Sequence, residues 1–93
     1  MQATLAGTVL AQSDETIVVE GNHYFPNASV KLDFFNDSET HTVCPWKGTA
    51  SYYHATVNGT TVKDIAWYYP ETSEKAKNIK NYVAFYKNKV TIA

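Results

Sequence analysis

Residues 50–69 read ASYYHATVNGTTVKDIAWYY, and they carry the clearest secondary-structure signal in the chain. Successive side chains of a strand point to opposite faces, and the aromatic and small residues here alternate with that period of two. Asn58-Gly59 interrupts the pattern, and this dipeptide favours a type I′ turn, in which both central residues have positive φ. The sequence therefore predicts an antiparallel hairpin of residues 50–57 and 60–69.

Further β segments are expected on both sides of this hairpin. Runs rich in β-branched or aromatic residues, bounded by polar turns, indicate short strands. Residues 4–11 and 16–20 are predicted to form one hairpin, and residues 82–86 and 90–92 another. Short strands are also expected at residues 23–25 and 30–34, with a polar loop at residues 36–39.

One segment, residues 72–80, has helical signals. Thr72 or Ser73 suits the N-cap, and the apolar stripe consists of Ala76 and Ile79. The predicted fold is mainly β, a curled antiparallel sheet or small open barrel of about seven or eight short strands. One short α-helix is expected near residues 73–80.

Length and composition agree with a small folded domain. A chain of 93 residues has room for one core, so residues 1–93 are expected to form a single domain. Hydrophobic residues make up 44% of the chain, which separates it from disordered proteins. Seven tyrosines and two tryptophans favour strands over helices.

Charge and termini restrict the expected partners. The chain has no arginine, the residue that reads guanine edges and clamps phosphates, and this argues against nucleic-acid binding. Residues 1–5, MQATL, lack the basic and apolar regions of a signal peptide or membrane span, so a cytoplasmic location is expected. No cofactor motif is present, and none is predicted.

Four segments carry a family resemblance: VLAQSDETIVVEGNHYFP (9–26), CPWKGTASYYHATVNG (44–59), DIAWYYPE (64–71) and YVAFYKNKV (82–90). In this order they resemble DUF427, a bacterial and archaeal family of uncharacterised domains with the motifs C-P-x-K-G-x-A-x-Y, A-W-x-Y-P and V-A-F-Y. The family also has a nucleotidyltransferase-like name. Nucleotidyl transfer needs two or three carboxylates that hold magnesium, usually with a Gly-Ser phosphate loop, and this sequence does not support that activity.

The candidate catalytic residues are Cys44 and Lys47. Cys44 is the only cysteine, so an intramolecular disulfide and a C-x-x-C motif are both excluded. In an enzyme, Cys44 would be the nucleophile, its thiolate would be favoured by Lys47 or His41, and Lys47 would stabilise negative charge. The alternative is an unreactive packed thiol, beside a turn lysine that lies over Trp46.

A zinc site is not predicted. His41, Cys44 and His54 are the one set of residues that resembles zinc ligands. A structural zinc site needs four ligands, and a catalytic site needs three with supporting carboxylates. His54 is instead expected to be a half-buried strand residue.

The candidate ligand-binding residues combine a turn with aromatic rings. Tyr52, Trp67 and Tyr69 are expected to meet across the predicted hairpin, where such rings form core or line a pocket for a flat or apolar ligand. Glu71 is the nearest acid and the candidate general base, unless it is only the first-turn acid of the helix. The full set is Lys47, Gly48, Tyr52, Trp67, Tyr69 and Glu71.

Three functional hypotheses follow. The first is a small soluble domain that binds a small ligand, possibly anionic, in a pocket made by the C-P-W-K-G turn and the strand aromatics. The second is an enzyme with Cys44 as nucleophile and Lys47 as electrostatic stabiliser. The third is a homo-oligomeric structural domain whose exposed aromatic residues form the interface.

Overall fold

The computed structural model describes residues 1–93 as nine strands and three short 3-10 helices. All strand pairs are antiparallel. The strands are β1 (Gln2–Leu5), β2 (Thr8–Gln12), β3 (Ile17–Val19), β4 (Asn22–Tyr24), β5 (Phe35–Cys44), β6 (Gly48–Val57), β7 (Thr60–Tyr68), β8 (Val83–Phe85) and β9 (Thr91–Ile92). The helices are η1 (Asn27–Ser29), η2 (Leu32–Phe34) and η3 (Glu74–Ile79).

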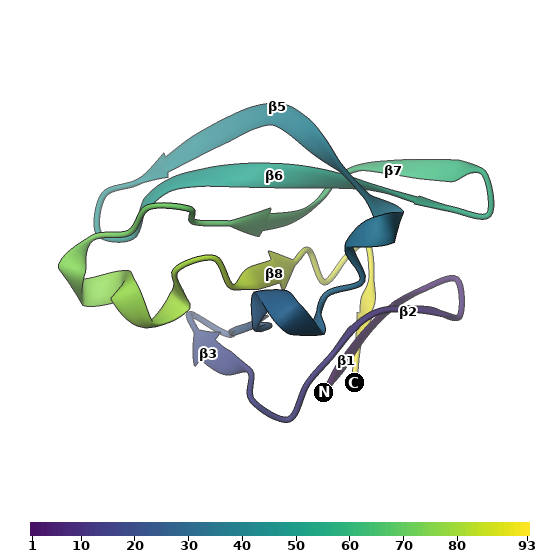
Figure 1. Cartoon of the computed structure of the whole chain (residues 1–93), viewed down its shortest axis with the longest axis horizontal. Coiled ribbons are helices and arrows are strands. Elements are labelled where there is room, and N and C mark those ends of the chain that lie inside the picture. The colour runs from purple at the N-terminus through teal and green to yellow at the C-terminus, as the bar shows by residue number, and fades with distance from the viewer.

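The strands form three sheets, with the orders β5-β6-β7-β8, β2-β1-β9 and β3-β4. Figure 1 shows the long strands β5, β6 and β7 above the two smaller sheets, with β8 between them. The two chain ends lie side by side (Figure 1), and Gln2 and Ala93 exchange backbone hydrogen bonds of 2.8 and 3.0 Å. The predicted mainly β, curled antiparallel architecture is confirmed, and the sheet does not close into a barrel.

The predicted central hairpin is confirmed as β6 and β7. Asn58 and Gly59 have φ angles of 52° and 79°, as a type I′ turn requires. The register shifts between Tyr53 and Ala55, and on β7 this irregular region includes Asp64, whose φ is 50°. Bulges of this kind re-aim side chains locally.

One face of the main sheet holds an aromatic row. Tyr52 pairs with Trp67, and Trp67 pairs with Ala84 on the next strand. These residues belong to a buried cluster with Tyr24 and with Ile79 from η3. The aromatic pairing expected across the hairpin is therefore present, as part of the core.

The opposite face of the sheet holds the larger part of the core. Tyr53, Ala66 and Phe85 form the neighbouring cross-strand row. This row packs against a cluster that includes the fully buried Leu10 and Phe25 from the N-terminal region. The main sheet is thus covered on both faces, which holds its strands in one register.

The prediction that residues 4–11 pair with residues 16–20 is wrong. Residues 4–11 contain the end of β1, a turn, and most of β2, which pair with each other, while β3 pairs with β4. Ala6 and Gly7 form that turn with φ angles of 50° and 81°. Because alanine seldom adopts positive φ, Ala6-Gly7 is a weak turn signal in a sequence.

Two assignments between residues 30 and 39 are also wrong. The strand predicted at residues 30–34 is largely η2, whose Leu32 is 46% exposed. The polar loop predicted at residues 36–39 belongs to β5, with an irregular register between Asp37 and His41. Pairing with β6 decides this segment against its polar composition, because strand formation depends strongly on tertiary context.

The helix predicted at residues 73–80 is 3-10 rather than α. The backbone N–H of Ala76 donates to Ser73 over 3.1 Å, and that of Lys80 donates to Lys77 over 3.3 Å, both with i→i+3 spacing. Ala76 and Ile79 are buried, as the apolar stripe predicts. None of the three helices has the length and hydrophobicity needed to cross a membrane.

The predicted C-terminal hairpin is wrong as well. β8 pairs with β7, and β9 pairs with β1, so residues 82–86 and 90–92 contribute to different sheets. Lys89 and Val90 both donate backbone hydrogen bonds to the carbonyl of Tyr86, which turns the chain away from β8. The C-terminal strand can then reach the N-terminal strand.

Candidate ligand site at the Lys47 turn

The turn between β5 and β6 carries Trp46 and Lys47. Inside the turn, the backbone N–H of Lys47 donates to the carbonyl of Cys44 over 3.2 Å. From outside, the backbone N–H of Ser73 donates to the carbonyl of Lys47 over 3.1 Å, and the Ser73 hydroxyl donates to the carbonyl of Trp46. The segment after β7 therefore fixes the turn.

Gly48 permits this close contact. Its φ is +128°, and a Cβ atom added there would lie 2.6 Å from the backbone oxygen of Glu71. Gly48 also forms an isolated antiparallel bridge with Thr72. Only glycine fits a position that combines this backbone conformation with so close an approach.

Lys47 is the only charged residue that the fold buries. Its side chain is 9% exposed, and its ammonium forms an ion pair with the carboxylate of Glu20, whose side chain is 56% exposed. The Nζ atom lies 5.1 Å from the ring centre of Trp46 and 5.7 Å from that of Tyr69. These distances allow cation–π attraction with both rings.

The pair shifts the pKa of both partners. Burial by itself lowers the pKa of Lys47, but the hydrogen bond to Glu20 and the nearby Tyr24 and Tyr69 outweigh it, so the pKa lies above its usual 10.5. The hydrogen bond and the charge of Lys47 lower the pKa of Glu20, and the neighbouring Trp46 indole adds to this effect. Both groups are therefore charged at neutral pH.

We refer to the residues gathered around this ammonium as the Lys47 site. It consists of Glu20, Tyr24, Cys44, Trp46, Lys47 and Tyr69. Tyr69 is 5% exposed, and burial raises the pKa of its phenol to about 12. Trp46 is 38% exposed and is thus the one ring of the site with a large surface open to solvent.

The predicted ligand-binding aromatics border this site but form core. Tyr52 and Trp67 are 7% and 9% exposed. The Trp67 indole N–H donates to the hydroxyl of Tyr24 over 3.2 Å, and the hydroxyls of Tyr52 and Thr42 are 2.9 Å apart. Their polar atoms are thus satisfied by the protein itself.

Cys44 shares the Lys47 site, whereas His41 does not. Cys44 is half-buried and packs against the cluster that contains Tyr69. His41 lies three residues earlier on β5, an odd spacing that places its side chain on the opposite face, where Nδ1 lies 3.3 Å from the Ser51 hydroxyl. No histidine base therefore stands beside the thiol.

The residues considered as zinc ligands do not converge. His54 lies in the bulged part of β6, where its Nδ1 accepts a hydrogen bond of 3.0 Å from the backbone N–H of Asp64. No group of three or more His, Cys, Asp or Glu side chains is arranged to hold a metal. Asp37 and Glu39, a D-x-E pair, are exposed on β5 and belong to no such group.

The carboxylate of Glu71 lies outside the Lys47 site. Its side chain is 90% exposed, and its Oε2 lies 3.9 Å from Nζ of Lys80. Only the backbone oxygen of Glu71 lies near the turn, at the position that a side chain on residue 48 would approach. The structure thus places the candidate general base in solvent.

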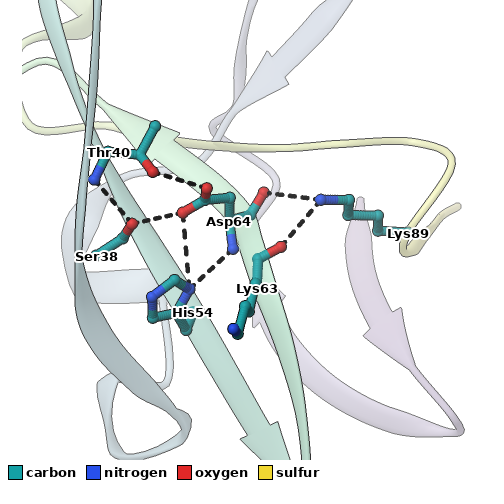
Figure 2. A network of polar contacts seen from close by, with 6 residues as sticks. All are labelled: Ser38, Thr40, His54, Lys63, Asp64 and Lys89. Carbon is teal, nitrogen blue, oxygen red and sulfur yellow. Dashed lines mark hydrogen bonds and ion pairs between the residues drawn. The ribbon is translucent and has the colours of Figure 1, made fainter.

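A second polar cluster, around Asp64, has no counterpart in the sequence analysis (Figure 2). The hydroxyls of Ser38 and Thr40 donate to the Asp64 carboxylate over 2.5 and 2.8 Å. The Lys89 ammonium donates to the backbone carbonyl of Asp64 over 3.3 Å, and His54 lies 3.6 Å from the carboxylate. The cluster joins the irregular parts of β5, β6 and β7.

The Asp64 cluster is a structural network. The pKa of Asp64 is lowered, chiefly by the hydrogen bond from Ser38. Thr40, His54 and Lys89 lower it further. The Ser38 hydroxyl donates to Asp64 and not to His54, so no imidazole is placed to take its proton, as a catalytic serine would require. Asp64 is the one acidic residue of β7, and no other feature of the sequence indicates this cluster.

Surface hollows occur away from the Lys47 site. One, of about 270 Å³, lies beside residues 4–6 and 87–91. The other, of about 180 Å³, lies between Leu5 and Ala6 and the tip of the β6–β7 hairpin. Neither hollow is lined by a residue of the Lys47 site.

The sequence comparisons concern the chain as a whole. No similar sequence is found among curated proteins. Residues 1–93 match the family described as "Domain of unknown function (DUF427)". The match includes every strand, the Lys47 site and the Asp64 cluster, and on this basis the chain belongs to the DUF427 family.

Proposed function

We propose that this chain is a small binding domain that holds the anionic group of a small ligand at Lys47. The observation that carries the proposal is the burial of Lys47, the single charged residue inside the fold. Removing an ammonium from water is costly, and apolar residues of similar volume often replace buried ion pairs without loss of stability. A buried lysine with one exposed partner is therefore explained better by binding than by folding.

The surroundings of Lys47 support a ligand with a flat or apolar part. The exposed ring of Trp46 lies beside the ammonium, and the buried ring of Tyr69 lies on another side of it. Gly48 and Ser73 hold the turn in place before any ligand arrives, and preorganisation of this kind reduces the entropic cost of binding.

The test is a titration with simple anions at constant ionic strength. Acetate, benzoate and inorganic phosphate are added separately, and the indole N–H resonances of the two tryptophans are followed by NMR. Lys47→Met removes the ammonium but keeps an unbranched apolar side chain. Lys77→Met is the matched control, because Lys77 also pairs with a glutamate, Glu74, but is 72% exposed.

We expect saturable shifts of the Trp46 resonance in the wild type and in Lys77→Met, and none in Lys47→Met. Unfolding midpoints of the two variants should remain close to the wild-type value. The proposal is wrong if no anion saturates the protein, or if the shifts survive in Lys47→Met.

A second candidate function, self-association, is favoured by the β5 edge. β5 is a ten-residue edge strand of the main sheet, and its Val43 is 77% exposed. Unpaired edges of this length are templates for pairing with another strand, here β5 of a second copy. Sedimentation over a concentration series tests this: a dimer should dissociate on Val43→Lys, and a strict monomer would exclude the idea.

A further inference from the structure

The Lys47 site already holds a carboxylate, which belongs to Glu20. The Glu20 carboxylate accepts a hydrogen bond from the Lys47 ammonium, with the Trp46 indole beside it. Lys47 has no other ion-pair partner. The fold thus shows directly which chemical group this ammonium, set among aromatic rings, accommodates.

The backbone of Glu20 is fixed, but its side-chain carboxylate is free to move away from the Lys47 ammonium. It forms the two-residue turn between β3 and β4 with Gly21, with φ angles of 54° and 80°. The Lys87 ammonium fixes this turn through the carbonyl of Gly21, over 3.0 Å. The Glu20 side chain itself is 56% exposed, so a change of its rotamer returns the carboxylate to water without moving the backbone.

We propose that Glu20 occupies the position of a ligand carboxylate, and that the ligand is a small carboxylic acid whose flat or apolar remainder lies on the exposed Trp46 ring. Binding then exchanges one carboxylate for another on Lys47. This inference rests on the proposed function, and it adds the ligand class and an internal competitor that lowers affinity in the wild type.

The donor set favours a carboxylate over a phosphate. The site offers one ammonium, with one indole N–H near it, and the chain has no arginine to add a bidentate clamp. Phosphate sites typically combine several backbone N–H groups, a helix N-terminus or more than one cation. A monoanion with an attached ring matches both the single charge and the exposed aromatic surface.

The ion pair is unequal in a way that makes Glu20 the mobile partner. Lys47 is 9% exposed and held among rings, so it cannot be rehydrated without disturbing the core, whereas Glu20 is already mostly in water. Water around the Glu20 carboxylate weakens the pair on that side, so a ligand that adds stacking on Trp46 can displace this carboxylate. Loss of the competitor should therefore tighten binding.

The test compares Glu20→Gln with the wild type, using benzoate and inorganic phosphate as probes. Glu74→Gln is the matched control, since Glu74 also pairs with a lysine, Lys77, but is 88% exposed and does not belong to the Lys47 site. We expect the dissociation constant for benzoate to fall about three- to tenfold in Glu20→Gln and to stay unchanged in Glu74→Gln. Phosphate should bind more weakly than benzoate in every variant.

The outcomes separate this inference from the proposed function. If benzoate binds in a Lys47-dependent way but Glu20→Gln does not tighten it, Glu20 is not a competitor. If phosphate binds more tightly than benzoate, the ligand class is wrong. In both cases the anion site itself stands, whereas failure of both anions to bind the wild type and Glu20→Gln overturns the proposed function as well.

Discussion

Replacing Gly48 by alanine places a methyl group too close to the backbone oxygen of Glu71. The added Cβ would stand 2.6 Å from that oxygen, and the backbone must keep a φ of +128°. Neither the turn nor the facing segment can move freely, because Ser73 bonds the carbonyls of Trp46 and Lys47. The substitution therefore strains the contact that positions Lys47.

The expected loss of stability has two parts. A non-glycine residue in this region of positive φ costs about 1–3 kcal/mol. Relieving a contact that is too short by several tenths of an ångström resembles overpacking and costs about another 1–3 kcal/mol. The sum of roughly 2–6 kcal/mol is a large share of the stability of a small domain, which is typically about 5–15 kcal/mol.

Urea denaturation measures this loss, with Gly59→Ala as the control. Gly59 also has positive φ, +79°, but an added Cβ there meets no atom within 4 Å, so that variant bears only the backbone cost, about 1–2 kcal/mol. With a slope near 1 kcal/mol/M, Gly48→Ala should lower the midpoint by roughly 2–6 M, and Gly59→Ala by roughly 1–2 M. Equal shifts in the two variants would show that the contact with Glu71 is not what requires glycine at position 48.

Three further predictions concern acid pH, the thiol and the buried indole. Because the pKa values of Glu20 and Asp64 are lower in the folded state, their stabilisation is present above about 4.5 and 3.8 and is lost as the pH falls further; Glu20→Gln and Asp64→Asn should each flatten the acid limb of a stability-against-pH curve. Cys44→Ser should leave benzoate affinity within about threefold, and rapid alkylation of Cys44 at neutral pH would instead favour the catalytic hypothesis, in which Lys47 stabilises the thiolate. Tyr24→Phe should lower the free energy of unfolding by about 1–3 kcal/mol, because the Trp67 indole N–H loses its acceptor, and an unchanged urea midpoint would contradict this.

Local chemistry explains the parts of the fold that the sequence predicts well. Asn58-Gly59 forms the predicted turn because these two residue types tolerate positive φ, whatever surrounds them. Alternation then sets which residues of β6 and β7 share a face, since the period of a strand is two. Ala6 and Glu20 also turn the chain at positive φ, but their residue types do not signal it, and the N-terminal pairing was predicted wrongly for that reason.

The same distinction holds for the candidate site. The short spacing from Cys44 to Gly48 ensures that the thiol, the ammonium and the glycine are close, and their selection from the sequence needed no tertiary information. The position of His41 on the other face also follows from strand alternation, once β5 is known to extend to Cys44. Glu71 is near in sequence, yet its carboxylate points to solvent.

The antiparallel β class, the central hairpin and the turn that carries Lys47 can all be predicted from the sequence, because dihedral preferences and strand periodicity act between neighbouring residues. The pairing of β8 with β7, the pairing of β9 with β1 and the contact between Glu20 and Lys47 depend on how the chain packs in three dimensions. Those contacts join segments far apart in the chain, and they form because the whole core must bury its apolar surface while each buried charge finds a partner.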